Sequence, residues 1–148
     1  MFENRENTIK ATAYIKFFGG FGALIFGYIL MAVGAFPPGH DLSLHVLGML
    51  GSKYANIAVN VAGIVVALVV RFDVRVTGNV NEFIREGKII HIYIDRDELN
   101  KNKTVTMPIC ANVKIALEQL TNVVDSRETN EWNSYLTKMR EDFPFTVA

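Results

Sequence analysis

The chain has 148 residues, of which 50% are hydrophobic and 20% are charged, and its formal net charge is zero. A balanced charge excludes the strong positive field that nucleic-acid binding uses, so we predict no nucleic-acid partner. The single cysteine, Cys110, excludes an internal disulfide, and we interpret it as a small buried apolar residue.

Hydrophobic residues concentrate before Arg71, and most charged residues follow it. This division predicts a membrane protein with two parts: a transmembrane hairpin over residues 1–71 and a small cytoplasmic α+β domain over residues 72–148.

The first predicted element is a transmembrane helix over residues 17–36, which contain no charged side chain. Twenty residues at about 1.5 Å each span about 30 Å, the thickness of the hydrocarbon core. A cleaved signal peptide is the alternative, because Lys10 and Lys16 precede the run and small residues near Ala35 resemble a cleavage site. The apolar region exceeds the usual length of a signal peptide, so we favour a membrane span.

The second predicted span covers about residues 50–70, after a turn at Pro37–Asp41. Residues 42–53 either extend this helix or lie at the membrane interface. Basic residues set the orientation: Arg5, Lys10 and Lys16 flank the first span, Arg71 and Arg75 follow the second, and Lys53 alone lies between. The positive-inside rule therefore places both termini in the cytoplasm, and we expect the bacterial inner membrane.

Each predicted span carries small or polar residues at helical spacing. They are Gly19, Ala23 and Gly27 in the first span, and Asn56, Asn60, Gly63 and Ala67 in the second. Helices in lipid associate through close packing and interhelical hydrogen bonds, so we expect these residues to form a helix-packing interface. The alternative is an oligomeric pore in which Asn56 and Asn60 face water.

A β-hairpin and two amphipathic helices are predicted after the membrane part. A β-hairpin joins residues 79–84 to residues 89–95 through a turn near Glu86–Gly87. The alternation of the second strand places Ile90, Ile92 and Ile94 on one face and Ile89, His91 and Tyr93 on the other. A helix begins at Pro108, and another carries Trp132 and Tyr135 and ends before Pro144. We name four aromatic residues as candidates for partner binding: Trp132, Tyr135, Phe143 and Phe145.

Motifs of catalysis are scarce in this sequence. His40 and His45 flank Asp41, which is weak evidence for a metal site, and Asp95–Lys103 lacks the spacing of a calcium loop. We therefore predict no catalytic residue, no cofactor and no metal ion. The leading hypothesis is a non-catalytic membrane subunit of a larger assembly, such as a secretion or conjugation complex.

The expected partners are the lipid bilayer, other membrane subunits and copies of the chain itself. The pore is the first alternative. The second alternative is a membrane-anchored regulatory or enzymatic domain, which would need a pocket around His91 or Cys110.

Overall fold

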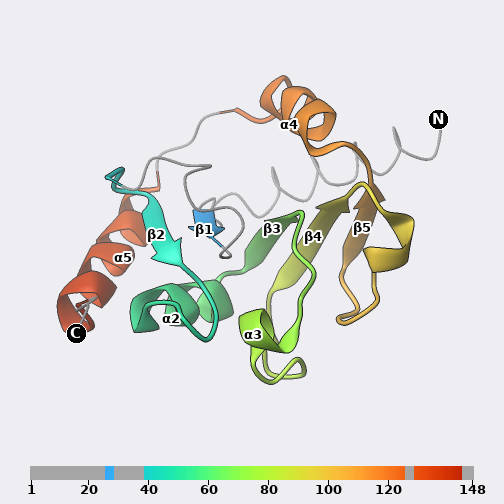
Figure 1. Ribbon diagram of the computed structural model, residues 1–148. Coiled ribbons are helices and arrows are strands. Elements are labelled where there is room, and N and C mark those ends of the chain that lie inside the picture. The colour runs from blue at the N-terminus through green and yellow to red at the C-terminus, as the bar shows by residue number, and fades with distance from the viewer. Residues whose placement is uncertain (1–25, 29–38, 126–128, 145–148) are drawn as a thin grey trace.

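A computed structural model describes residues 26–28, 39–125 and 129–144 (Figure 1). Helices alternate with strands along most of this length. The order is β1 (Phe26–Tyr28), β2 (Ser43–Val46), α2 (Lys53–Val61), β3 (Ile64–Leu68), α3 (Val74–Thr77), β4 (Lys88–Tyr93), the 3₁₀ helix η2 (Arg96–Glu98), β5 (Met107–Cys110), α4 (Val113–Thr121) and α5 (Asn130–Asp142).

All described strand pairs are parallel. β1 pairs with β2, and a separate sheet has the order β3-β4-β5. Within it, Ile64 is opposite Lys88 and Leu68 is opposite Ile92, while Ile90 is opposite Met107. The pattern defines an α/β fold, because parallel strands are joined by crossover segments rather than by tight turns.

Both faces of the β3-β4-β5 sheet are covered. One face contributes to a buried cluster of Val59, Ala67, Phe72, Val76, Phe83, Ile84, Ile89 and Val105. The other contributes to a cluster of Ile64, Ile90, Ile92, Met107, Ile109 and Ala116. Burial on both faces explains why these strands are apolar at nearly every position.

Helix α2 begins where the Ser52 hydroxyl accepts a hydrogen bond from the amide of Ala55 at 3.2 Å. It ends at Val61, and Ala62 already has an extended backbone. Helix α5 lies beside α2 and β2, where Leu136 joins a cluster with Leu44, Tyr54, Ala55 and Ala58 (Figure 1).

The predicted second membrane span is wrong. Residues 50–70 contain a turn, the nine-residue helix α2 and strand β3 rather than one long helix. Nine residues of helix extend only about 14 Å. Residues 54–70, which form most of α2 and all of β3, contain no charged side chain, as in a membrane span, so hydropathy alone did not separate the two.

The first predicted span lies outside the described residues except for residues 26–28, which form β1. Within the described parts of the chain, no helix is long and apolar enough to cross a membrane. Strand β3 precedes Arg71 and pairs with β4, which follows it, so hydrogen bonds join the two halves that hydropathy divides.

The β-hairpin of the predicted α+β domain is also wrong, because β4 pairs in parallel with β3 and β5 and no strand is found at residues 79–84. The predicted helix start at Pro108 falls in β5, and α4 begins at Val113. The predicted faces of β4 are confirmed, since Ile90 and Ile92 join one cluster and Ile89 the other. The end of α5 before Pro144 is confirmed as well.

Candidate functional site

The connection from β3 to α3, residues 69–73, has an unusual backbone and is called the β3–α3 turn below. Val69 has φ +56° and Phe72 has φ +49°. A positive φ is a genuine outlier for a β-branched residue such as valine, and it costs about 1–3 kcal/mol, so it persists only where surrounding contacts hold it. Such backbone strain concentrates at functional sites, so this turn is a candidate functional site.

Hydrogen bonds to distant parts of the chain hold the turn. The Val69 amide donates to the Ile92 carbonyl at 3.0 Å. The Val70 carbonyl oxygen lies 2.7 Å from His91 Nε2, and the Arg71 carbonyl accepts from Asn102 Nδ2 at 2.8 Å. At the end of the turn, Asp73 Oδ1 accepts from the Val76 amide at 3.2 Å and caps α3.

Aromatic rings pack beneath the turn. Phe72 is buried, and its ring centroid lies 5.0 Å from that of His91 and 6.2 Å from that of Phe83, both in edge-to-face geometry. The His91 ring also meets Tyr93 at 5.8 Å. Burial of the His91 side chain lowers its pKa below the ordinary value, so the imidazole is neutral at neutral pH.

Arg71 is the charged group that the turn presents to solvent. Its side chain is 67% exposed, its Nε lies 3.4 Å from the Tyr93 hydroxyl, and Glu98 Oε2 lies 3.9 Å away. The hydrogen bond to Tyr93, followed by the charge of Glu98, raises the pKa of Arg71. Glu98 in turn accepts from Lys101 Nζ at 2.7 Å. An exposed guanidinium anchored on one side can bind an anionic group on the other.

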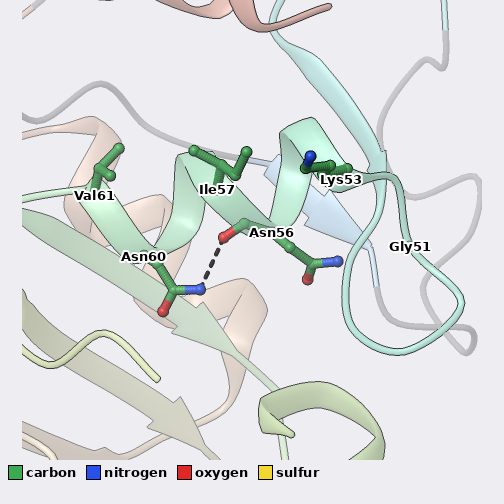
Figure 2. Close-up of a pocket in the computed structure, with 6 residues that line it drawn as sticks. All are labelled: Gly51, Lys53, Asn56, Ile57, Asn60 and Val61. Carbon is green, nitrogen blue, oxygen red and sulfur yellow. Dashed lines mark hydrogen bonds between the residues drawn. The ribbon is translucent and has the colours of Figure 1, made fainter. Parts of the chain in front are cut away.

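The structure gives Asn56 and Asn60 partners within the chain. Asn56 Oδ1 accepts from the Gly48 amide at 3.0 Å, and its Nδ2 donates to the Gly48 carbonyl at 3.0 Å. Asn60 Oδ1 accepts from the Ile84 amide at 2.8 Å. Its Nδ2 donates to the Asn56 carbonyl at 2.9 Å, the bond drawn in Figure 2.

Both asparagines line an open groove of about 520 Å³ along α2, together with Gly51, Lys53, Ile57 and Val61 (Figure 2). Their amides are engaged by backbone groups: Asn56 fixes the loop at Gly48 that precedes α2, and Asn60 fixes the connection at Ile84 that leads into β4.

The remaining predicted interface residues do not share one helix. Gly63 lies between α2 and β3, and Ala67 is buried in β3. Gly27 lies in β1, whereas Gly19 and Ala23 lie outside the described residues. The one-sided stripe of residues 56, 60, 63 and 67 is broken because the helix ends at Val61.

Three of the four aromatic candidates pack inside the chain. Trp132, Tyr135 and Phe143 cover the α2–α5 cluster, and the Trp132 and Tyr135 rings are stacked at 5.5 Å. Phe145 lies outside the described residues. Within residues 26–28, 39–125 and 129–144, no group of histidine, cysteine and acidic residues could hold a metal ion.

Sequence reasoning missed the β3–α3 turn. A signal was present, since Arg71 and Asp73 interrupt a long apolar run directly after a buried strand, and polar residues at strand ends are common binding groups. The local sequence pattern could not predict the positive φ values, nor the contact between His91 and Val70, which are 21 residues apart.

These features define the chain as an α/β domain with a parallel sheet. A strained turn follows strand β3, and residues of the neighbouring strand β4 hold this turn in place. Residues 12–120 match the family described as the central domain of thiamine pyrophosphate enzymes. The match covers more than half of the chain, and the chain belongs to this family.

Named relatives agree with this assignment. The chain is 43% identical over 121 residues to acetolactate synthase 2 of Nicotiana tabacum, which is 78% of this chain and 18% of that protein. It is 40% identical over 123 residues to the acetolactate synthase of Arabidopsis thaliana, which is 79% of this chain and 18% of that protein. Both relatives are named as chloroplastic. The chain therefore spans about a fifth of the length of these relatives.

These findings correct the functional predictions. The chain belongs to an enzyme family and resembles acetolactate synthases, so a non-catalytic membrane subunit of a secretion complex is wrong. The same similarity overturns the expected lipid and membrane-subunit partners and the bacterial inner membrane, and the described residues include no membrane-spanning helix. The pore alternative required a membrane helix that carries Asn56 and Asn60 through residue 70, whereas α2 ends at Val61 and strand β3 follows.

Proposed function

We propose that this chain acts as the central domain of a thiamine pyrophosphate enzyme that forms acetolactate. The observation that carries the proposal is the 43% identity over 121 residues to an acetolactate synthase. Identity at this level over most of the chain supports a shared role for the domain as well as a shared fold.

The part of the site that this domain supplies is the β3–α3 turn with Arg71. Its guanidinium is 67% exposed and anchored by Tyr93 and Glu98. Ligands of parallel α/β sheets bind beyond the carboxyl ends of the strands, and the turn follows the carboxyl end of β3 while Tyr93 ends β4. The bound group would be anionic, a phosphate or a carboxylate, because arginine pairs with both in a bidentate manner.

The described residues do not fit a diphosphate site that uses a metal. Magnesium bound to a diphosphate takes further oxygen ligands, commonly one or two carboxylates. Within the described segments, no cluster of such residues could hold the ion. The thiamine pyrophosphate of this family would accordingly be held by other parts of the enzyme, which fits a domain that spans 18% of its relative.

A segment exchange tests the proposed function. Residues 12–120 of this chain replace the matching segment of the Nicotiana tabacum acetolactate synthase 2, and acetolactate formation is measured with thiamine pyrophosphate and Mg²⁺. We expect kcat/KM within about tenfold of the parent enzyme, a difference of about 1.4 kcal/mol in transition-state stabilisation.

The control is the same hybrid with Arg71→Met, which keeps an unbranched side chain of similar length and removes the charge. We expect it to fold with an unchanged melting temperature and to lose activity. A hybrid that folds like the parent but forms no acetolactate would contradict the proposed function.

A further inference from the structure

We propose that His91 is a positioning residue for Arg71: its Nε2–H and its ring fix the β3–α3 turn in the conformation that presents the guanidinium. This role rests on the proposed function in one respect only, the use of Arg71 for ligand binding. The turn geometry itself is a property of this chain.

The contacts of His91 converge on the turn. The imidazole has no exposed surface, and its Nε2 lies 2.7 Å from the Val70 carbonyl oxygen, directly before Arg71. Its ring packs edge-to-face on Phe72, directly after Arg71, with centroids 5.0 Å apart. One buried side chain therefore contacts both chain neighbours of Arg71.

The same ring supports the side chain of Arg71. The His91 ring packs on Tyr93, and the Tyr93 hydroxyl lies 3.4 Å from Arg71 Nε. Thus His91 acts on the backbone of the turn directly and on the guanidinium through one intermediate ring.

The tautomer of His91 follows from its surroundings. A carbonyl oxygen can only accept, so Nε2 carries the proton, and Nδ1 is left as an acceptor. Nδ1 is buried and has no hydrogen-bond partner. Buried polar atoms without partners are rare and unfavourable. Because the histidine leaves Nδ1 unpaired here while Nε2 bonds to Val70, we infer that the Nε2 hydrogen bond has a specific use.

The backbone that His91 contacts is the strained part of the chain. Val69 at φ +56° and Phe72 at φ +49° flank the contact. Backbone in these regions persists only where neighbouring groups over-determine it. The hydrogen bond to Val70 and the ring packed on Phe72 are constraints of that kind.

A first test examines the ring of His91 in the intact 148-residue chain. Nuclear magnetic resonance with ¹⁵N-labelled histidine identifies the protonated nitrogen. We expect a proton on Nε2 and none on Nδ1, with the Nε2 proton protected from exchange. A proton on Nδ1, or a rapidly exchanging ring, would overturn the proposal without any variant being made.

A second test uses two amide variants that differ only in reach. In His91→Gln the side-chain amide nitrogen lies near the position of Nε2 and can donate to Val70, whereas in His91→Asn it reaches only the position of Nδ1. Trypsin cleavage after Arg71 reports the opening of the turn. We expect cleavage about fivefold faster in His91→Asn, the ratio that corresponds to one lost hydrogen bond, and close to the parent rate in His91→Gln.

Cleavage after Lys114, in α4, is the internal control and should not change between the variants. Equal rates after Arg71 in both variants would contradict the role of the Nε2–H. If His91→Asn proves too unstable to digest in its folded form, His91→Phe keeps the ring on Phe72 and removes the donor, and it should show the same faster cleavage.

The link to activity is tested in the exchanged enzyme described above. We expect kcat/KM for acetolactate formation to fall about fivefold with His91→Asn and to recover with His91→Gln. An unchanged kcat/KM in His91→Asn would overturn the positioning role. An exchanged enzyme without any activity would instead contradict the proposed function, and the two measurements on the chain alone would still decide the proposal for His91.

Discussion

Asn60 Oδ1 accepts a hydrogen bond from the backbone amide of Ile84 at 2.8 Å, across 24 residues of sequence. Ile84 has φ +50°, an unfavourable value for a β-branched residue, and its side chain is buried. The last turn of α2 thereby fixes the connection that leads into β4.

We predict that Asn60→Leu lowers the free energy of unfolding by about 1–3 kcal/mol, because the Ile84 amide is left without its acceptor. Asn60→Asp keeps the acceptor for Ile84 but, like Asn60→Leu, loses the Nδ2 donor to the Asn56 carbonyl, so it should be destabilising by less than Asn60→Leu. Urea unfolding of the two variants distinguishes them. A neutral Asn60→Leu would show that the amide has another role.

Two glycines offer a matched test of close packing. A Cβ atom on Gly87 would lie 2.4 Å from the Ala62 carbonyl oxygen and 2.7 Å from Ile84 Cγ2, whereas a Cβ atom on Gly63 would meet nothing within 4 Å. We expect Gly87→Ala to cost about 1–3 kcal/mol in unfolding free energy through overpacking. Gly63→Ala should be neutral or stabilising by up to about 1 kcal/mol, since the unfolded chain loses freedom.

Thermal and urea unfolding measure both glycine variants. The comparison also separates the observed fold from a packed membrane hairpin, in which Gly63 would be the sensitive position. A destabilising Gly63→Ala beside a neutral Gly87→Ala would contradict the observed packing.

The pH dependence of stability should carry a contribution from His91. Burial lowers its folded pKa below the ordinary value of 6.5, so the unfolded chain binds the proton more readily. The stability that a neutral His91 contributes is complete above pH 6.5 and is lost as the pH falls below that value. The slope can reach about 1.4 kcal/mol per pH unit.

The measurement is urea unfolding at several values between about pH 5 and 8, the range in which histidine titrates. His91→Gln, which does not titrate, should lack this part of the slope, and the difference between the two chains isolates His91. Identical slopes would show that His91 is protonated in the folded chain as easily as in the unfolded one.

The attachment of α5 depends on Arg140. Its Nη2 donates to the Ser43 carbonyl at 2.7 Å and to the Asp41 carbonyl, which joins the last described helix to β2. We predict that Arg140→Met lowers the free energy of unfolding by about 1–3 kcal/mol, because two carbonyl acceptors lose a charged donor. Arg140→Lys can restore one of these bonds and should be milder.

Trp132 is the sole tryptophan of the chain, lies in α5 and packs against the cluster that includes Leu44 of β2 and Tyr54 of α2. Its fluorescence therefore reports whether α5 is docked. A red shift in Arg140→Met at denaturant concentrations below the main loss of far-UV circular dichroism would confirm local release. Simultaneous loss of both signals would indicate that α5 unfolds with the rest of the chain.

Local sequence patterns were enough to predict those elements in which the spacing of hydrophobic residues matches the observed helix or strand. The spacing of Trp132, Tyr135, Leu136 and Met139 predicted α5 and its end before Pro144. Alternation in β4 predicted its two faces, because a strand presents successive side chains to opposite sides whatever it pairs with. The direction of pairing and the identity of the partner strands were absent from that alternation.

The sequence by itself determined that residues 54–70 would contribute to an apolar interior, since this run contains no charged side chain, and seven of its residues, among them Ala58 and Ala67, are buried. Only the tertiary structure decided what that interior is, because a short helix and a strand of a parallel sheet have the same composition as a membrane helix. It also decided the candidate site, where Val70, Arg71 and Phe72 meet His91, Tyr93, Glu98 and Asn102. Those contacts join residues that are about 20 or more positions apart in the sequence, so the local spacing of residue types cannot predict them.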